Sequence, residues 1–232
     1  MKFIKTNCAQ RCHIYDNIYT QIQPKVVVIG DSHMRGCALN LRNNLKDSCQ
    51  VTGYVNPGAQ TQGIVNSTKQ DIGKLTKNDV VVVIGGTNDI GKNNSKQGVR
   101  NITKFVSECQ HTNVIVMNAP HRHDLVDWSC VNLEVKHFNN NLKKKMKNFN
   151  NTTTIDMASE RKYFTRHGLH MNNTGKENMA KKITEEVKRI VHQKKESIVL
   201  RWIEDETILK TEEDPVIDIG SDTIKEKDCQ RT

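Results

Sequence analysis

Short apolar runs alternate along the chain with segments in which apolar residues recur at the spacing of one helix face. The short runs predict five strands, at residues 26–29, 51–55, 80–84, 114–117 and 153–155. The runs at 26–29 and 80–84 contain no polar residue, which is typical of parallel strands buried on both faces. We therefore expect the sheet to be parallel.

Helical patterns fill the segments between the predicted strands. They lie at residues 37–45, 97–109 and 131–149, and a last helix follows Asn173-Thr174-Gly175, with Met179, Ile183, Val187, Ile190 and Val191 spaced along it. Strands that alternate with helices in this way favour a sheet covered on both faces and joined by right-handed crossovers. The pattern predicts an α/β fold, a three-layer α/β/α sandwich around a five-stranded parallel sheet.

The domain organisation follows from where this pattern begins and ends. A chain of 232 residues has room for one sizeable α/β domain, which we place at residues 25–195. Residues 1–24 lack periodicity and end in a proline, so we interpret them as a loose leader. Residues 196–232 are rich in acidic and polar side chains, and we expect a mostly disordered tail there.

The cysteines and the hydropathy indicate the compartment. Seven scattered cysteines, without an apolar amino-terminal segment for secretion, favour reduced thiols and a cytoplasmic or nuclear protein. Cys8, Cys12 and His13 are close enough for a zinc site, but no second ligand cluster follows, so we expect unpaired thiols in the leader. With a mean hydropathy of -0.66 and no long apolar run, we expect a soluble protein with no membrane span.

The charge of the chain is unevenly distributed. Residues 196–232 carry 11 acidic and 5 basic side chains, a balance of -6, so residues 1–195 carry +15 of the total charge of +9. A body this basic is attracted to polyanions such as nucleic acid or anionic lipid surfaces, and the acidic tail could screen it. We therefore include weak nucleic-acid binding among the expected properties.

Polar groups of chemical interest follow the strands at four places. They are Gly30-Asp31-Ser32-His33, Asn56-Pro57-Gly58-Ala59, Gly85-Gly86-Thr87-Asn88-Asp89 and Arg166-His167-Gly168-Leu169-His170-Met171-Asn172. Taken singly, each is ordinary turn or helix-capping sequence. Because the carboxyl ends of parallel strands lie at one edge of the sheet, the four segments together predict a shared site there.

The ordered set resembles the SGNH (GDSL) hydrolases, esterases whose four blocks contribute Ser, Gly, Asn and His. The resemblance covers roughly residues 25–191 and rests on Gly30-Asp31-Ser32, on Gly58, on Gly86-Thr87-Asn88-Asp89 and on the segment 168–172. It implies a flavodoxin-like fold and serine esterase chemistry. The phrases at residues 119–125 and 164–170 look most like the esterase domains encoded by animal transposable elements.

The resemblance assigns roles that also make chemical sense. The hydroxyl of Ser32 needs a base to remove its proton, and His170 is the candidate base. The oxyanion formed on attack needs donors, which we expect from the backbone N–H of Ser32, the N–H of Gly58 and the side-chain amide of Asn88. Asp31, in the first block, joins the catalytic candidates. No metal and no cofactor are expected.

The sequence departs from the family pattern beside the predicted base. Most members place an aspartate three residues before the catalytic histidine, and His167 occupies that position here. Three arrangements stay open: a Ser32–His170 dyad oriented by a backbone carbonyl, His167 as the orienting residue, or Asp156 or Asp124 acting from elsewhere. Reduced activity is a fourth possibility.

Further residues are candidates for substrate binding. His121 and Arg122 end the fourth strand on the same sheet edge, and His33 follows the nucleophile, so we expect these three to contact substrate. A metal site formed by His121 and His123 is the weaker interpretation, because no carboxylate or cysteine lies at a convincing spacing.

We carry three functional hypotheses. The first is a serine esterase that acts on a small acetyl or short-acyl ester through an acyl-enzyme on Ser32. The second is a weakly active or inactive SGNH domain, of mobile-element origin, that binds nucleic acid or protein. The third, a lipid-surface esterase, fits the charge but lacks an amphipathic anchor with bulky apolar residues.

Overall fold

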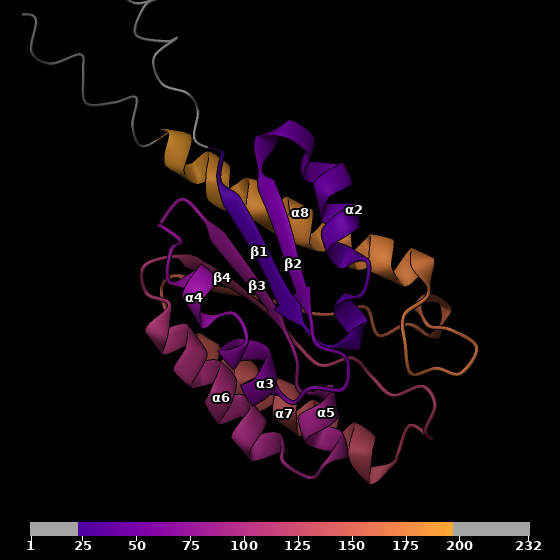
Figure 1. The fold of residues 1–232 in the computed structure, drawn as a ribbon. Helices are drawn as coiled ribbons and strands as arrows, with labels where there is room; N and C mark the ends of the chain where they lie inside the picture. Colours follow the sequence, from indigo (N-terminus) through magenta and orange to yellow (C-terminus); the bar gives the residue numbers. More distant parts are fainter. Residues whose placement is uncertain (1–22, 197–232) are drawn as a thin grey trace, which may run out of the picture. The chain divides into compact units, whose positions relative to one another are not determined.

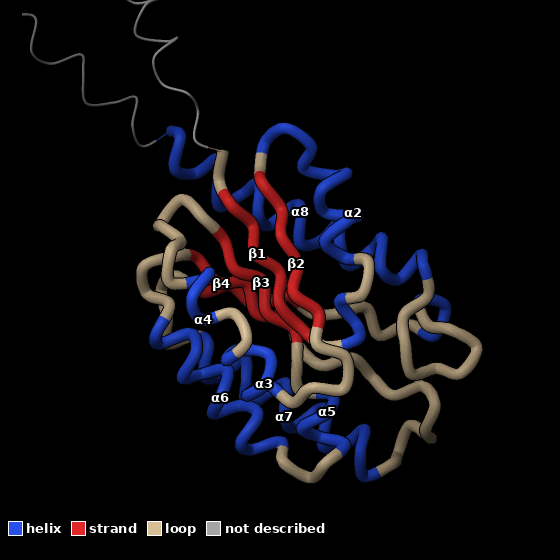
Figure 2. The backbone as a smooth tube through the Cα atoms, viewed as in Figure 1, coloured by secondary structure: helices blue, strands red, loops and turns tan. Residues whose placement is uncertain are grey.

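A five-stranded parallel sheet forms the centre of the fold in a computed structural model, which describes residues 23–196 (Figure 2). The strands are β1 (Lys25–Gly30), β2 (Gln50–Val55), β3 (Val80–Ile84), β4 (Asn113–Met117) and β5 (Thr152–Ile155). Their order across the sheet is β2-β1-β3-β4-β5, and every pair is parallel. The predicted five-stranded parallel sheet is confirmed, with strand bounds that differ by one residue or less.

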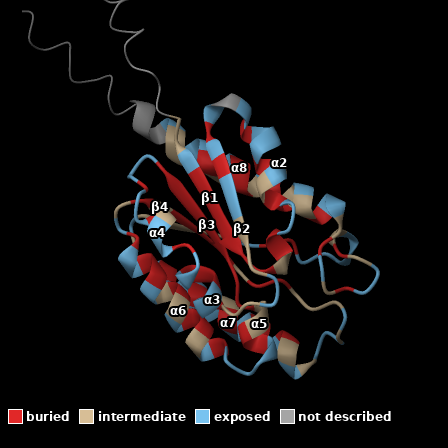
Figure 3. Cartoon of the chain, viewed as in Figure 1, coloured by how far each residue is buried: buried red, intermediate tan, exposed pale blue. Residues whose placement is uncertain are grey.

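The two uninterrupted apolar runs lie side by side inside the sheet. All five residues of β3 are buried, and so are the last five of β1 (Figure 3). The register pairs Gly30 with both Val55 and Ile84, the last residues of the two neighbouring strands. The segments that follow β1, β2 and β3 therefore leave the sheet at one edge.

Helices cover both faces of the sheet, so the predicted three-layer sandwich is confirmed (Figure 1). Alternate residues of each strand point to opposite faces. Val26 and Val28 pack with α2 (Cys37–Leu45) and α8 (Asn173–Glu196). The other face packs on α3 (Thr61–Asn66), α4 (Lys69–Ile72), α5 (Thr87–Gly91), α6 (Ser95–Glu108) and α7 (Cys130–Met146). Two apolar cores, one on each side of the sheet, hold these layers together.

The sequence pattern did not predict three short helices. They are α3, α4 and α5 (Thr87–Gly91), each of four to six residues. Segments this short do not show a 3.6-residue period, so only the long helices are visible as patterns. Residues 23–196 also include the 3-10 turns η1 (Ser32–Met34), η2 (Lys46–Ser48) and η3 (Arg161–Tyr163).

Several sequence predictions fall outside the described residues. The leader with Cys8, Cys12 and His13 lies there, except for Gln23 and Pro24, and so does the acidic tail beyond residue 196. Within the described part of the chain, Cys37, Cys109 and Cys130 are free thiols. No helix among the described residues is both long enough and apolar enough to cross a membrane.

Candidate active site

The turn after β1 presents Ser32 at the edge of the sheet. Asp31 caps the short η1 turn, and its Oδ1 accepts a hydrogen bond from the backbone N–H of His33 at 3.0 Å. Gly30 is required by close packing, because a Cβ there would lie 2.4 Å from the Met34 side chain and 2.7 Å from the Ile84 carbonyl oxygen. A tight, capped turn therefore fixes the position of the hydroxyl.

The structure brings together the predicted nucleophile and base. Ser32 Oγ and His170 Nε2 are 3.2 Å apart, although the residues are 138 positions apart in the chain. The loop that carries His170 is held by a bridge between Phe164 and Met171, and the Thr165 N–H donates to the His170 carbonyl at 2.8 Å. This separation is within the reach expected of a nucleophile and its general base in a substrate-free site.

Asn88 also reaches this edge, from the first turn of α5. Its Nδ2 donates to the carbonyl oxygen of Ala59 at 2.9 Å and to Asp31 Oδ2 at 3.4 Å. The helix begins after Gly86, which has a φ of +115° and would place a Cβ 2.4 Å from the Phe138 ring. Donation from Asn88 to an oxyanion would require the longer contact, to Asp31, to yield.

Gly58 lies in the turn after β2, where it is exposed and has a φ of +75°. Nothing lies within 4 Å of the position of a Cβ there. Its neighbour Ala59 accepts the hydrogen bond from Asn88, but Gly58 is not among the residues that line the cavity beside Ser32. The structure thus brings Gly58 to the correct sheet edge, at the margin of the site.

Ser32 and His170 open onto a cavity of about 250 Å³. Among the predicted site residues, Asp31, His33, Asn88 and Arg122 line it as well. Four further lining residues were missed by the sequence, namely Thr87, Gly91, Lys92 and Leu169. Thr87 and Leu169 lie within the quoted motif segments and could have been suspected, whereas no sequence signal points to Lys92.

Burial gives the two residues that flank Ser32 unusual pKa values. Asp31 has no exposed surface, and its burial raises the pKa to about 6, opposed by the hydrogen bond from the His33 N–H. His33 is 2% exposed, and its burial lowers the pKa to about 4, helped by the charges of His170 and Arg122. His33 is therefore a neutral imidazole near pH 7.

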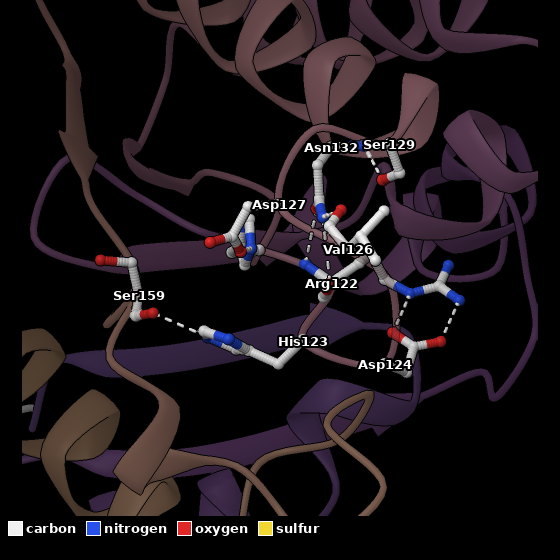
Figure 4. Close-up of polar contacts among 9 residues, drawn as sticks. Arg122, His123, Asp124, Val126, Asp127, Ser129, Asn132 and Ser159 are labelled. Atoms are coloured by element: carbon white, nitrogen blue, oxygen red, sulfur yellow. Dashed lines mark hydrogen bonds and ion pairs between the residues drawn. The ribbon is translucent and has the colours of Figure 1, made fainter.

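The segment after β4 positions Arg122 in the cavity wall. Asn132 on α7 accepts from the Arg122 N–H at 2.9 Å and donates to the Arg122 carbonyl at 3.1 Å (Figure 4). The guanidinium donates from Nε and Nη2 to both oxygens of Asp124, at 2.8 and 2.7 Å. This pairing lowers the pKa of Asp124 and raises that of Arg122.

The two histidines of the same segment have other surroundings. His121 Nε2 is 3.2 Å from the Asp127 carboxylate and does not line the cavity. His123 contacts the Ser159 carbonyl oxygen through Nε2 at 2.7 Å (Figure 4). Its ring packs on the Phe164 ring. Among the described residues, no group of three His, Cys, Asp or Glu side chains could hold a metal ion.

In a catalytic triad a third residue, usually a carboxylate, is hydrogen-bonded to the base. His170 has no such partner in the described part of the chain. The exposed His167 side chain makes no hydrogen bond or ring contact in the described part of the chain, and Asp156 binds Asn118 and Lys143 at 2.9 and 2.8 Å. Asp124 is close enough for the charge of His170 to contribute to its lowered pKa, but Arg122 holds both of its oxygens.

No family model and no curated protein matches this sequence. Solved structures match the fold at low identity. A GDSL-like lipase from Bacteroides thetaiotaomicron superposes with a TM-score of 0.60 at 16% identity, covering 78% of this chain and 97% of that one. A lipolytic protein of the G-D-S-L family from Veillonella parvula gives 0.61 at 19% identity, with 71% and 98% covered.

A third match is the carboxy-terminal catalytic domain of peptidoglycan O-acetyltransferase A from Streptococcus pneumoniae, a structure with a methylsulfonyl adduct. Its TM-score is 0.57 at 15% identity, and the superposition covers 74% of this chain and 95% of that domain. The chain therefore has the fold of the SGNH (GDSL) hydrolases, as the four sequence blocks predict.

Proposed function

We propose that the protein is a serine esterase that hydrolyses small carboxylic esters through an acyl-enzyme on Ser32. The observation that carries the proposal is the 3.2 Å contact between Ser32 Oγ and His170 Nε2 at the wall of a cavity. A neutral imidazole at this distance can accept the hydroxyl proton as the oxygen attacks a carbonyl carbon.

The reaction then has two halves. Attack by Ser32 Oγ forms a bond to the carbonyl carbon and transfers the Oγ proton to His170. Collapse of the tetrahedral intermediate breaks the bond to the alcohol oxygen, which takes the proton from His170 and leaves. Water then attacks the acyl group on Ser32, with His170 again removing the proton and returning it to Ser32.

The oxyanion of the intermediate needs donors at the same edge of the sheet. We assign this role to the backbone N–H groups of Ser32 and Gly58 and to the side chain of Asn88. The side chain of Asn88 lines the cavity together with Ser32. As the oxyanion forms, the 3.4 Å contact of Asn88 with Asp31 is the one that a new acceptor can replace.

The size of the cavity favours a small substrate. About 250 Å³ is less than the roughly 300–1,000 Å³ of sites for drug-sized ligands. An acetyl or short-acyl ester fits such a volume. The structural neighbours support acyl chemistry in general, because they include lipases and an acetyltransferase domain.

Labelling by a fluorophosphonate probe tests the proposal. We expect the wild type to be labelled and to hydrolyse 4-nitrophenyl acetate, and Ser32→Ala and His170→Ala to lose at least about 1,000-fold in turnover. Ser107→Ala is the matched control, since that hydroxyl lies on α6 and donates to the Lys104 carbonyl. An unlabelled wild type, or equal labelling of Ser32→Ala, would contradict the proposal.

A further inference from the structure

One wall of the cavity is rich in hydrogen-bond donors and positive charge. Lys92, at the end of α5, and Arg122, after β4, both line the cavity together with Ser32 and His170. Esterase chemistry on an uncharged acetyl ester gives neither side chain a role. Two cations at the reacting site therefore call for a separate explanation.

Arg122 is held in place, and its Nη1 makes no hydrogen bond within the described part of the chain. Asp124 takes hydrogen bonds from Nε and Nη2, and the third nitrogen, Nη1, faces away from that carboxylate (Figure 4). The side chain of the buried Asn132 is hydrogen-bonded to both the N–H and the carbonyl oxygen of Arg122, which fixes the backbone there. A guanidinium fixed in this way can donate to an anionic oxygen at little cost in conformational entropy.

His33 adds a neutral polar side chain to this wall. The residue lines the same cavity and is 98% buried. Its Nδ1 has almost no accessible surface and no hydrogen-bond partner in the described part of the chain, so this atom does not face the cavity. Contact with an anionic ligand is therefore a matter for Arg122 and Lys92.

The carboxylates near this wall are already engaged by the protein. Asp31 accepts from the His33 N–H and from Asn88, one bond to each oxygen. Asp124 is bound by Arg122 through both oxygens. Neither carboxylate therefore takes Nη1 of Arg122, and Lys92 adds a positive charge.

The position of this wall relative to the base identifies the part of the substrate that it would bind. The ring of His33 lies 5.5 Å from that of His170, and both His33 and Asp124 respond electrostatically to His170. His170 must stand next to the alcohol oxygen, because it gives that oxygen a proton on departure. The wall formed by Lys92, Arg122 and His33 is thus on the alcohol side.

We propose that the natural substrate is an ester whose alcohol part carries an anionic group, a carboxylate or a phosphate, bound by Arg122 with help from Lys92. This inference rests on the proposed esterase function and names the substrate class of the same site. Arg122 is then a specificity-determining residue. The anionic oxygens accept from its guanidinium, and Lys92 adds a positive charge beside them.

Three acetyl esters of similar size test the proposal. They are the neutral 4-acetoxybenzamide, 4-acetoxybenzoate and 4-acetoxyphenyl phosphate, with each rate divided by that of hydroxide-catalysed hydrolysis. We expect the wild type to prefer at least one anionic ester by about tenfold in kcat/KM, which is the effect of one charge-assisted hydrogen bond. The anionic ester with the higher relative kcat/KM identifies the recognised group as a carboxylate or a phosphate.

Variants separate a specific contact from the general charge of the protein. Arg122→Gln should bring the preference close to one, and Arg122→Lys should restore part of it. Lys144→Gln, which removes the same charge from an exposed position on α7, should keep the wild-type preference. Equal rates for all three esters in the wild type, or a preference that survives in Arg122→Gln, would overturn the inference while leaving the esterase function intact.

A binding measurement on Ser32→Ala makes the test independent of turnover. We expect 4-acetamidobenzoate to bind about tenfold more tightly than 4-acetamidobenzamide in an NMR titration, and the difference to vanish when Arg122→Gln is added. Equal affinities of the two amides would overturn the inference. If no ester is hydrolysed but the Arg122-dependent difference appears, the anion site is supported and the esterase proposal fails.

Discussion

The backbone N–H of His123 donates a hydrogen bond to the carbonyl oxygen of Gly168 at 3.1 Å, and it joins the loop of the general base to the segment that carries Arg122. The two segments touch closely at this point, because a Cβ on Gly168 would lie 2.4 Å from the His123 carbonyl carbon. Gly168 also has a φ of +81°, where a side chain is strained. The position of His170 thus depends on the packing of a neighbouring glycine.

Gly168→Ala should therefore lower both stability and catalysis. We expect kcat/KM for 4-nitrophenyl acetate to fall by about tenfold or more, because the clash displaces the loop of His170. The matched control is Gly36→Ala, since Gly36 has a φ of +83° and open space around its Cβ position. That variant should lose only about 1–2 kcal/mol in unfolding free energy and keep its activity. Equal activity losses in both variants would contradict this account.

The buried Asp89 of α5 is hydrogen-bonded to Thr61, the first residue of α3. Its two oxygens accept from the Thr61 N–H and the Thr61 hydroxyl, each at 2.9 Å, and Asn101 donates to the same hydroxyl at 3.1 Å. Thr61→Val removes the hydroxyl at nearly constant volume and leaves buried groups unsatisfied. We expect a loss of about 2 kcal/mol in urea unfolding and a lower kcat, because Asn88 adjoins Asp89.

A similar pair at the opposite end of the strands provides the control. Thr76 donates to Asp79 from its N–H and hydroxyl, at 2.7 and 2.8 Å, but Thr76 is exposed. Thr76→Val should cost under about 1 kcal/mol and leave kcat unchanged. If Thr61→Val lowered stability without changing kcat, the link from Asp89 to the site would be wrong.

The part of the site that could be predicted is the part set by topology. Ser32 and Asn88 each follow a buried parallel strand, and such strand ends meet at one edge whatever the loops do. The fold was also predictable, because the apolar runs of the strands and the regular apolar spacing of the long helices can be recognised in the sequence. His170 comes after the last strand and just before the long helix α8, so its approach to Ser32 followed from the resemblance to known blocks.

The remaining features depend on side-chain packing, which no local pattern encodes. Arg122 could be placed at the sheet edge, but its pairing with Asp124 depends on Asn132, ten residues away. Lys92 enters the cavity because a five-residue helix, too short to be recognised, turns the chain there. We expected His33 to contact substrate. That it is buried, with a ring nitrogen lacking a hydrogen-bond partner in the described part of the chain, could not be predicted from its residue type alone.

A carboxylate at position 167 tests whether the missing triad member limits turnover. His167→Asp restores the residue that most SGNH hydrolases have there, and we expect kcat to rise about tenfold if the new carboxylate orients His170 and stabilises its protonated form. His167→Asn is the matched control, because it has nearly the same shape without the charge. A kcat that stays level or falls in His167→Asp would contradict the idea that the missing carboxylate limits turnover.

Asp31 and His33 should make opposite contributions to the pH dependence of stability. Burial raises the pKa of Asp31 from 3.8 to about 6, so the unfolding free energy loses about 3 kcal/mol as the pH rises through that range. Burial lowers the pKa of His33 from 6.5 to about 4, so a similar amount is gained as the pH rises. Relative to the wild type, urea unfolding between pH 4 and 6 should show stability falling with pH in His33→Leu and rising in Asp31→Asn. In the double variant, the slope of unfolding free energy against pH should return to that of the wild type. If the single variants have the wild-type slope, Asp31 and His33 do not make opposite contributions.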